Sequence, residues 1–502
     1  MAVWYLYSIL GLIVLSIFTK HFLNKIQNLP PTPFPCLPII GHLYLLKQPI
    51  HATLSRIAKR YGHVLLLRLG SRKVLVVSSP SAAEECLTKN DIVFANRPRF
   101  LIGKHLAYNF TTISWAPYGD HWRNLRRIAS LELLSPTRLQ MLYDIRADEM
   151  RMMIRTLLDS QERVVDLRPL LFELTLNMMM RMITGKSYYG KNVGDLEEAN
   201  RFREFHVETF KLGSATTIGD FFPWIKSWNI ERRMIACQTK RDGFTQELME
   251  ERRRKMKADS YYGGRKETML DVLLSLQESE PEYYSDEIIK GLMLDLILGG
   301  TDTTINTMEW ALSLLLNHPE ELERAQIEID NHISEGRLLH ESDLPHLPYL
   351  RSIINETMRM YPAPLLAPQE SSAECSVGGF RIPAGTTLMI NVWAIQNDPN
   401  IWTDPTNFKP ERFKGISETT GVKDVFRLMP FGYGRRSCPG DGLALRVIGL
   451  TLGSLIQCFE WTRVDKEMVD MTEGISFTLQ KARPLQAKCR PRAAMAEMLS
   501  KI

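Results

Sequence analysis

The decapeptide FGYGRRSCPG, from Phe431 to Gly440, places one cysteine among three glycines, two adjacent arginines and a proline. Cys438 is one of seven cysteines, which are widely scattered and include no CxxC pair that would suggest a zinc site. The apolar segment LALRVIGL follows and predicts a helix that begins just after this cysteine. Taken alone, the decapeptide leaves two interpretations open: an inert buried thiol, or a cysteine held in a shaped loop for its chemistry.

Composition limits the class of protein to which the chain can belong. Its 502 residues are 44% hydrophobic, which is enough for a large core and more than the usual length of one domain. The formal net charge is +5 with acids and bases nearly balanced, so composition does not support a role with nucleic acid. An odd number of scattered cysteines is typical of reduced thiols on the cytosolic side of a membrane.

The N-terminus reads AVWYLYSILGLIVLSIFT from Ala2 to Thr19, an uncharged run long enough to span a bilayer as a helix. Lys20, His21 and Lys25 follow it. The alternative, a cleaved signal peptide, lacks a basic region before the run and a small-x-small cleavage site after it. We therefore predict a transmembrane signal anchor over residues 1–24, with the rest of the chain facing the cytosol.

A proline-rich connector follows in the stretch LPPTPFPCLPIIGHL, Leu29 to Leu43. Proline fixes φ and removes a backbone donor, so residues 25–43 are predicted to form a stiff extended stalk rather than more helix. Beyond it there is no repeat and no second break in composition, which predicts one domain over residues 44–502. Residues 63–79 read as two strands around a Gly-Ser turn, and helical patterns dominate after them.

The longest apolar helix of this domain is predicted from Gly291 to about Asn317, and GGTDTT from Gly299 to Thr304 lies in its middle. Glycine and threonine are poor residues for a buried helix, since glycine costs about 1 kcal/mol relative to alanine there. The glycines leave room for another body, and Asp302 and Thr303 place a carboxylate and a hydroxyl beside that gap. A threonine can also simply bond to the preceding turn, so this motif alone decides nothing.

Three further motifs contain charged residues at helical or aromatic-flanked positions. SIINETMRMYP places Glu356 and Arg359 at i and i+3 on one helix face, a pair that on a surface would contribute little. FKPERF supplies Arg412 as a third member of a buried charge cluster. WRNLRR presents the Trp122 indole and the Arg126 guanidinium to an anionic group.

Together and in this order, the motifs resemble those of the cytochrome P-450 family of haem-thiolate monooxygenases, over essentially the whole chain. The decapeptide matches the haem-binding signature, GGTDTT the oxygen-activation motif, and the Glu356–Arg359 pair and FKPERF the Glu-x-x-Arg and partner-arginine motifs. WRNLRR is a weaker match to a haem-propionate motif. The resemblance implies the cytochrome P-450 fold, mainly α with small β-sheets, with an N-terminal single-pass membrane anchor.

The same resemblance implies haem b as the cofactor, with its iron held by an axial thiolate. The cofactor-binding positions are Trp122, Arg126, Phe431, Gly434, Arg436, Cys438 and Gly440. Cys438 would be the metal ligand, and backbone amides and the helix that follows would stabilise its negative charge. The glycines let the backbone approach a flat macrocycle, and Arg436, Arg126 and Trp122 would reach the haem propionates.

Roles for the remaining motifs also follow from the resemblance. Asp302 and Thr303 would be the catalytic pair that delivers the protons needed when O₂ is reduced. Glu356, Arg359 and Arg412 would form a structural cluster near the haem, and its loss would prevent haem incorporation.

Electrons must come from a partner, because the chain has no fused flavin domain and no GxGxxG dinucleotide motif. An NADPH-cytochrome P-450 reductase of the endoplasmic reticulum membrane is implied, with O₂, a lipophilic small molecule and membrane lipid as the other partners. The arginines predicted to form a docking face near the thiolate are Arg123, Arg127, Arg427 and Arg435. Asp441 departs from the small apolar residue usual in the family, and its charge is expected to affect redox potential or reductase contact without abolishing activity.

By resemblance, substrate contacts fall in residues 100–114, 296–301, 363–368 and 474–478. The residues predicted to line the pocket are Leu101, Ile102, Phe110, Leu296, Leu365, Leu366, Ile475 and Phe477. So apolar a lining fits a lipophilic substrate that enters from the membrane. The stretches NFTTISWAPYGDHWRNLRRI and RLMPFGYGRRSCPG resemble plant microsomal members that hydroxylate isoflavones, other phenylpropanoids, indolic compounds and triterpenoids, or close methylenedioxy bridges on lignans. The sequence does not choose among these substrates.

Two alternative functions share parts of this pattern. A hydroperoxide isomerase or dehydratase of the same fold needs neither O₂ nor reductase, and the intact Asp302–Thr303 pair argues against it. A non-catalytic haem-binding carrier or sensor would have no use for a proton relay. The sequence therefore favours the monooxygenase over both.

Overall fold

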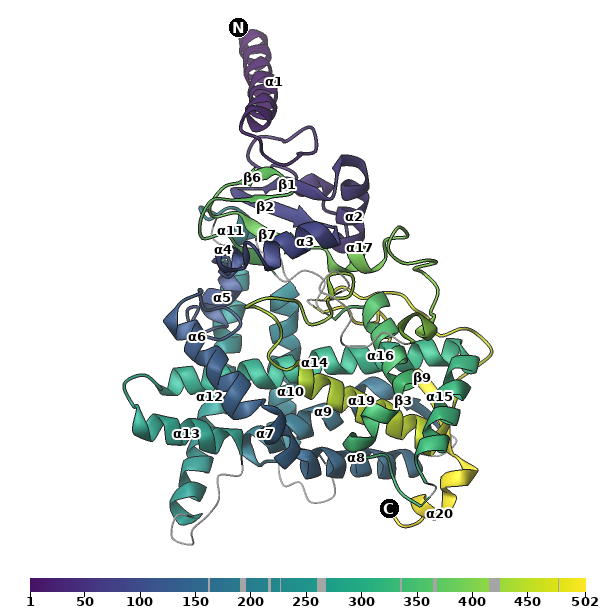
Figure 1. Ribbon diagram of the computed structural model, residues 1–502. Helices are drawn as coiled ribbons and strands as arrows, with labels where there is room; N and C mark the ends of the chain where they lie inside the picture. Colours follow the sequence, from purple (N-terminus) through teal and green to yellow (C-terminus); the bar gives the residue numbers. More distant parts are fainter. Residues whose placement is uncertain are drawn as a thin grey trace.

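The computed structural model describes residues 1–160, 163–189, 196–214, 218–225, 227–259, 268–334, 336–363, 368–414, 425–476 and 478–502. These residues form a mainly helical body with small β-sheets, as the sequence predicts, and an N-terminal helix that stands away from it (Figure 1). The largest sheet lies at the end of the body nearest that helix.

The largest sheet has four strands in the order β1-β2-β7-β4. β1 (Val64–Leu69) and β2 (Arg72–Val77) form an antiparallel hairpin, which confirms the strands predicted within residues 63–79. At the turn, Gly70 has a φ of +59° and a Cβ there would lie 2.5 Å from the Phe221 carbonyl oxygen, so only glycine fits. The sheet is completed by β7 (Thr387–Ile390), parallel to β2, and β4 (Gln369–Glu370), antiparallel to β7.

Two smaller antiparallel sheets complete the strands of the described residues. The first contains β3 (Val164–Asp166), β9 (Gln486–Pro491) and β8 (Phe459–Arg463), in the order β3-β9-β8. The second is the hairpin of β5 (Cys375–Val377) and β6 (Phe380–Ile382).

The helices form most of the body. In the first part of the chain they are α1 (Ala2–Ile26), α2 (Ile50–Tyr61), α3 (Pro80–Leu87), α4 (Asp91–Phe94), α5 (Leu101–His105), α6 (Asp120–Arg127), α7 (Pro136–Met141), α8 (Tyr143–Leu158) and α9 (Leu167–Thr184). In the remainder they are α10 (Leu196–Ser214), α11 (Ile218–Phe221), α12 (Trp228–Asp259), α13 (Met269–Ser279), α14 (Asp286–Asn317), α15 (Pro319–His332), α16 (Pro348–Met360), α17 (Val392–Gln396), α19 (Asp441–Cys458) and α20 (Ala496–Leu499). Short single-turn helices include η4 (Glu341–His346) and η5 (Pro410–Phe413).

Helix α14 crosses the middle of the body and packs against α9, α16 and α19 (Figure 1). Most of its side chains are buried because other helices surround it, which explains why the sequence is apolar on all its faces. The predicted end at Asn317 is confirmed, whereas the helix begins at Asp286, earlier than the predicted Gly291. Pro319 opens α15, as its place in a first helical turn predicts.

Helix α19 begins directly after the decapeptide, as predicted, and it is largely buried. Among the described residues it is the one helix whose length and composition would allow it to cross a membrane, and 72% of it is buried inside the protein. A buried helix of this kind belongs to the core of the body, beneath α14.

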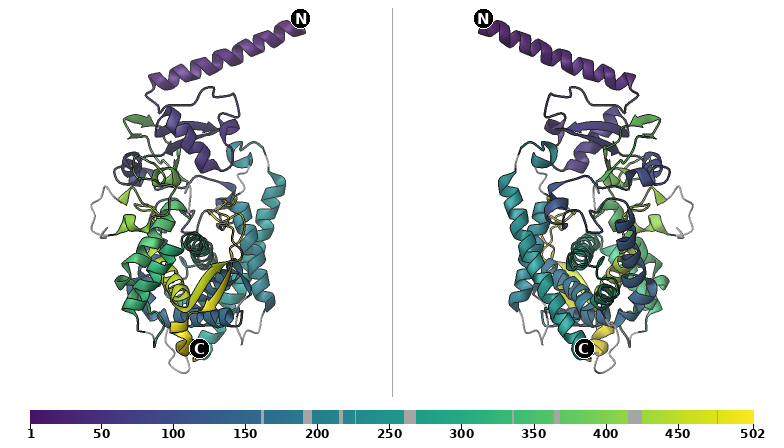
Figure 2. Two further views of the ribbon diagram at one scale, coloured as in Figure 1. Left: turned by 90° about the vertical axis from the view of Figure 1, so that its right-hand side faces the viewer. Right: turned by 90° about the vertical axis from the view of Figure 1, so that its left-hand side faces the viewer.

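The predicted anchor forms helix α1, and Figure 2 shows it projecting from the sheet end of the body in both views. At 1.5 Å per residue its 25 residues extend about 38 Å. Trp4 and Phe22 are 78% and 65% exposed. The proline-rich segment after it is not a free linker, because the Pro31 and Ile40 carbonyls accept hydrogen bonds from the backbone N–H groups of Leu66 and Gly70.

Candidate functional site

The decapeptide forms a closed loop in front of α19. The Cys438 N–H donates to the Phe431 carbonyl at 2.8 Å, and Gly434, with a φ of +74°, makes the turn between them. A Cβ at Gly434 would lie 2.6 Å from an Asp91 oxygen, so a side chain there would displace α4. The loop therefore has one shape, and it presents Cys438 three residues before the helix.

The sulfur of Cys438 is only partly exposed and accepts a hydrogen bond from the Gly440 N–H at 3.3 Å. Burial raises the pKa of the thiol, and the negative charge of Asp441 adds to this, while the Gly440 bond and Arg126 act in the opposite direction. Protein alone therefore favours the neutral thiol. A cation bound at the sulfur would reverse that balance, since metal coordination deprotonates a thiol.

Three arginines surround the loop. Arg436 donates to the Ala95 and Ala116 carbonyls at 2.6 and 2.5 Å, and its guanidinium lies 4.4 Å from the centre of the Trp122 ring. Arg126 donates to the carbonyl and hydroxyl oxygens of Ser437. The structure thus brings together Trp122, Arg126, Arg436 and Cys438, which the sequence assigned to one cofactor. The Trp122 indole N–H, its only donor, is bonded to the Ile113 carbonyl at 3.0 Å, so it does not have the free donor expected for a propionate.

The third arginine, Arg97, was not predicted. It donates to the Ser114 and Pro368 carbonyls at 2.9 and 2.6 Å. Burial and the positive charges of Arg97 and Arg126 lower the pKa of Arg436 to about 9. A lone arginine before a proline in a loop has no spacing that links it to the other two, so the sequence contains no signal for this residue.

Among the described residues, none of these three guanidinium groups makes an ion pair with a carboxylate. Buried cations that share a site without a directly paired anion are costly, because burial disfavours the charged form and the charges repel. The arrangement therefore fits an anionic ligand with more than one acidic group. Haem, with two propionates, fits this donor set, and Cys438 nearby fits its iron.

Helix α14 borders open space at Gly299. This glycine is exposed in the middle of an otherwise buried helix, and a Cβ built on it meets nothing within 4 Å. Its neighbour Gly300 serves a different purpose, because a Cβ there would lie 2.7 Å from the Met179 sulfur of α9. The expected close approach of another body is thus found at Gly300, while Gly299 borders open space.

The Thr303 hydroxyl donates to the Gly299 carbonyl at 2.7 Å, one turn earlier on α14. This is the back-bonding that threonine commonly makes in helices. Because the hydroxyl proton is held by Gly299, the lone pairs of Thr303 Oγ1 can accept a hydrogen bond beside the open space. Thr303 can therefore bond to the preceding turn and still present an acceptor to the open space.

Asp302 points to a different set of partners. Its Oδ2 accepts hydrogen bonds from the Thr478 hydroxyl and, at 3.1 Å, from the Asn306 amide. Burial raises the pKa of this carboxyl, while Thr478, the Arg168 charge and Asn306 oppose the increase. A carboxyl with a raised pKa retains a proton closer to neutral pH and is better suited to proton transfer.

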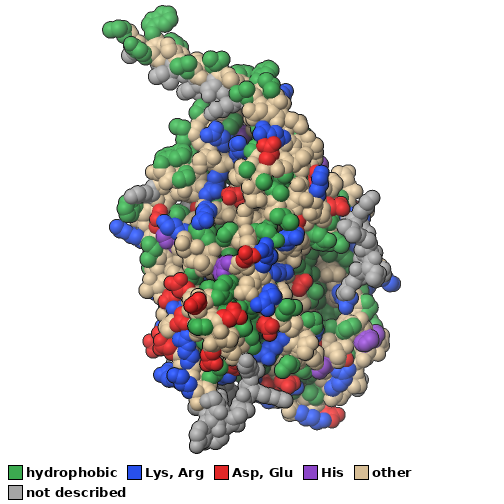
Figure 3. Space-filling model, turned by 60° about the vertical axis from the view of Figure 1, so that its left-hand side comes forward, with side chains coloured by type: hydrophobic (Ala, Val, Ile, Leu, Met, Phe, Trp, Pro, Cys, Tyr) green, Lys and Arg blue, Asp and Glu red, His purple; other side chains and the backbone are tan. Residues whose placement is uncertain are grey.

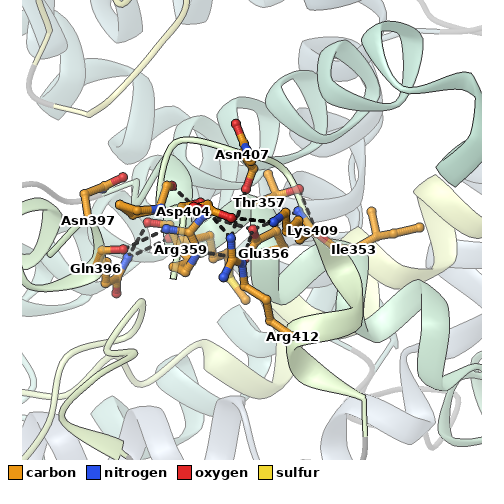
Figure 4. A network of polar contacts seen from close by, with 12 residues as sticks. Ile353, Glu356, Thr357, Arg359, Gln396, Asn397, Asp404, Asn407, Lys409 and Arg412 are labelled. Carbon is orange, nitrogen blue, oxygen red and sulfur yellow. Dashed lines mark hydrogen bonds and ion pairs between the residues drawn. The ribbon is translucent and has the colours of Figure 1, made fainter. Parts of the chain in front are cut away.

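Glu356 and Arg359 form a fully buried ion pair and not a surface pair (Figure 4). The two carboxylate oxygens of Glu356 lie 2.6 and 2.9 Å from the Arg359 Nε and Nη2 atoms. Glu356 also accepts from the Lys409 N–H at 3.0 Å and from the Arg412 Nε at 3.2 Å. The three residues predicted as a structural cluster are thus in contact.

The cluster is connected to the cysteine loop through Gln396. Arg359 donates to the Gln396 carbonyl at 2.8 Å, and the Gln396 side chain donates back to the Arg359 carbonyl at 2.9 Å. The same side chain accepts from the Met429 N–H at 3.1 Å, and the Met429 carbonyl accepts from Gly432 in the decapeptide. The charge cluster therefore supports the loop that presents Cys438.

The predicted pocket residues have different environments. Leu101 and Ile102 of α5 are half-buried, and Phe110 and Leu296 are buried. Ile475 is 71% exposed. Leu365, Leu366 and Phe477 lie outside the described residues.

The arginines predicted as a docking face are all exposed. Arg123 forms an ion pair with Asp120, and Arg435 with Asp91 at 2.5 Å, so part of their charge is already compensated. Asp441 opens α19 and its carboxylate accepts from the Gly442 N–H at 2.7 Å, a favourable position at a helix N-terminus.

A family model described as Cytochrome P450 matches residues 30–488. Cytochrome P450 81Q32 of Catharanthus roseus is 49% identical, over 99% of this chain and 98% of the relative. An isoflavone 3'-hydroxylase of Medicago truncatula is 47% identical over 96% and 97%, and a (+)-piperitol/(+)-sesamin synthase of Sesamum radiatum 45% over 99% and 98%. A zebrafish cytochrome P450 solved with abiraterone has a TM-score of 0.75 at 24% identity, covering 88% of this chain and 99% of that one.

Proposed function

Because this chain belongs to the cytochrome P450 family and is thus a haem-thiolate monooxygenase, we propose that it oxidises a lipophilic plant specialised metabolite. The reaction would insert one oxygen atom from O₂, by hydroxylation or by oxidative ring closure. The relatives named as an isoflavone hydroxylase and a sesamin synthase support this substrate class. Bound haem would supply the reduction of O₂ and the oxidising centre.

One observation carries the proposal: hydrogen bonds and the short backbone segment of residues 113–116 connect the cysteine loop to α14, the helix that contains Asp302 and Thr303. Arg126 holds Ser437 beside Cys438, and Arg436 holds Ala116 and, at 3.3 Å, Ile113. The next residue, Ser114, bonds to α14 four residues before Gly299. The loop that contains Cys438 and the open space next to Thr303 are thus connected through the same segment, as a haem bound between them would require.

Within this arrangement each residue has a distinct role. Cys438 would bind the iron, and the Gly440 N–H would share the negative charge of its sulfur. Arg97, Arg126 and Arg436 would bind the propionates. Thr303 Oγ1 would accept a hydrogen bond from a group in the open space at Gly299 and so hold that group in place, while the carboxyl of Asp302 would exchange protons with solvent.

Substituting Thr303 with alanine should uncouple electron use from product formation. Removing Oγ1 leaves no acceptor at the open space, so the product formed per NADPH should decrease about tenfold or more while peroxide is released. Thr303→Ser keeps the hydroxyl and should remain coupled. Equal coupling of Thr303→Ala and the natural enzyme, measured as product per NADPH, would refute this role.

The first experiment is turnover by microsomes that contain this protein with an NADPH-cytochrome P450 reductase. Flavonoids, lignans, indoles and triterpenoids would be supplied together and the products identified by mass spectrometry. A product one oxygen heavier or two hydrogens lighter, formed only with NADPH and reductase, supports the proposal. Product formation from hydroperoxides without reductase would instead favour the isomerase alternative.

We further propose that the sheet end of the body faces the membrane of the endoplasmic reticulum. Helix α1 leaves the body at this end, and Figure 3 shows hydrophobic side chains along it. Ile39 is 67% exposed nearby, and Trp224 and Trp228 are 66% and 61% exposed just after α11. The Phe221 carbonyl of α11 accepts from the Ser71 N–H in the β1–β2 turn, so these side chains lie at the same end. Exposed tryptophans are typical of a membrane interface.

A chain lacking residues 1–26 should therefore still bind liposomes through this end. Replacing Trp224 and Trp228 together by serine should weaken that binding about tenfold or more, since each buries a large apolar surface. Ile327→Ser, on the 53% exposed Ile327 of α15, is the control. Binding that is unaffected by the tryptophan substitutions in liposome flotation would contradict this orientation.

A further inference from the structure

The segment of residues 97–116 lies against one face of α14. Gly291 and Asp295 are one helical turn apart, and Gly299 follows one turn later, so the three share that face. A Cβ at Gly291 would lie 3.0 Å from the Thr112 methyl group, which shows how closely the segment approaches. The segment predicted to contact substrate and the open space at Gly299 therefore lie along the same face of the same helix.

Asp295 makes the polar contact between the two. Its Oδ2 accepts a hydrogen bond from the Ser114 N–H at 2.9 Å and another from the Ser114 hydroxyl at 2.8 Å. The Thr112 hydroxyl lies 3.0 Å from the Ser114 hydroxyl. Where water is scarce, an N–H and a hydroxyl that share one acceptor atom have no ready replacement for it, so the loss of that atom is costly.

Ser114 is held from its other side by Arg97. The Ser114 carbonyl accepts from Arg97 Nε at 2.9 Å, and Arg97 also donates to the Pro368 carbonyl at 2.6 Å. The N–H, the hydroxyl and the carbonyl of one residue are thus all engaged. Three of the four predicted substrate-contact segments, those of residues 100–114, 296–301 and 363–368, are joined by these bonds or lie next to them.

The segment needs such support because its backbone is unfavourable on its own. Tyr108, Asn109 and Phe110 are consecutive non-glycine residues with φ values of +44°, +53° and +65°. Left-handed conformations of such residues persist only where surrounding contacts hold them. The Tyr108 hydroxyl donates to Asp242 of α12 at 2.9 Å, and Asp295 holds the other end of the segment.

From these contacts we infer that Asp295 is a positioning residue, which acts through Ser114 to fix this segment against α14 and so determines which carbon of the substrate is oxidised. The inference rests on the proposed monooxygenase function for its second part only. Both bonds end on one oxygen, so an acceptor atom at that position is what the contact requires. Asparagine can provide that acceptor, whereas leucine has a similar size and none.

The test compares Asp295→Leu, Asp295→Asn and Ser114→Ala with Glu287→Leu, a control at an exposed carboxylate of the same helix. Hydrogen exchange of the peptide that contains Ser114 is measured by mass spectrometry on the haem-loaded protein. The same preparations are then supplied with reductase and one isoflavone, daidzein, and the ratio of products oxidised at different carbons is determined. A reduced-CO band confirms the thiolate-ligated haem in each.

In Asp295→Leu we expect Ser114 to exchange about tenfold or more faster and the product ratio to change, because both hydrogen bonds to Oδ2 are lost and the Ser114 N–H is left without that acceptor. Asp295→Asn should be close to the natural enzyme in both measurements, and Ser114→Ala should change in the same direction as leucine but less.

Unchanged exchange in Asp295→Leu, or an asparagine variant that behaves like leucine, would overturn the inference. Faster exchange with an unchanged product ratio would overturn its second part. If the leucine variant shows no reduced-CO band, Ser114→Ala is used in its place. Unchanged hydrogen exchange in Ser114→Ala would then refute the positioning role of Asp295. A natural enzyme that forms no product refutes the proposed substrate class, while hydrogen exchange still tests the contact.

Discussion

Replacing Glu356 by glutamine should lower the free energy of unfolding by about 3–5 kcal/mol and prevent formation of the reduced-CO band. The substitution leaves the Arg359 guanidinium fully buried without its counter-charge, and one neutral amide oxygen replaces the two carboxylate oxygens that Arg359, Arg412 and the Lys409 N–H share. Since Gln396 joins this cluster to Met429, the disturbance reaches the cysteine loop. Urea unfolding followed by circular dichroism measures the first effect, and the reduced-CO spectrum of expressed protein measures the second.

Glu411 offers a matched control for this prediction. It lies in η5 beside Arg412, but it is exposed. Glu411→Gln should change stability by less than about 0.5 kcal/mol and leave the band intact. If Glu356→Gln were equally harmless, the cluster could not be what holds the loop, and its burial would have another explanation.

Replacing Cys438 by serine should abolish the reduced-CO band of a thiolate-ligated haem and lower turnover to below about 1% of the natural enzyme. A hydroxyl is a poor ligand for haem iron and donates far less electron density than a thiolate. The loop itself should survive, because its shape depends on the Cys438 N–H bond to Phe431 and on the left-handed Gly434. Circular dichroism should therefore show native helix content together with the lost band.

Cys375→Ser is the control, because Cys375 is a partly exposed free thiol in β5 with no part in the loop. It should keep both the band and the activity. Retention of the band in Cys438→Ser would mean that another cysteine among the seven ligates the iron. Circular dichroism distinguishes the two variants, since Glu356→Gln should impair folding whereas Cys438→Ser should remove only the ligand.

Much of the fold was predictable because local patterns and tertiary packing agree. The hairpin around Gly70, the end of α14 at Asn317 and the start of α15 at Pro319 follow from turn and helix signals within a few residues. The start of α14 was missed, because Asp286 and Glu287 are polar and the apolar pattern begins only later. Charged residues in a first helical turn are common, and they conceal the true helix start.

For residues in ambiguous motifs, burial and contacts could be determined only from the structure. Whether Glu356 and Arg359 are a weak surface pair or a buried ion pair depends on what covers the helix, which spacing does not encode. GGTDTT similarly contains two glycines with different purposes, and only packing shows that Met179 fills the space at Gly300 while Gly299 remains open.

Short motifs in the sequence were enough to identify three features: the loop that presents Cys438, the glycine–threonine interruption of the central helix, and the arginines and glutamate of the cluster. Tertiary structure alone decided how distant residues combine. Arg97 joins Arg126 and Arg436, and Asp295 holds Ser114, across large separations in sequence. Short motifs encode backbone shape and local spacing, whereas electrostatic and hydrogen-bond partners are chosen by which surfaces the folded chain brings within reach.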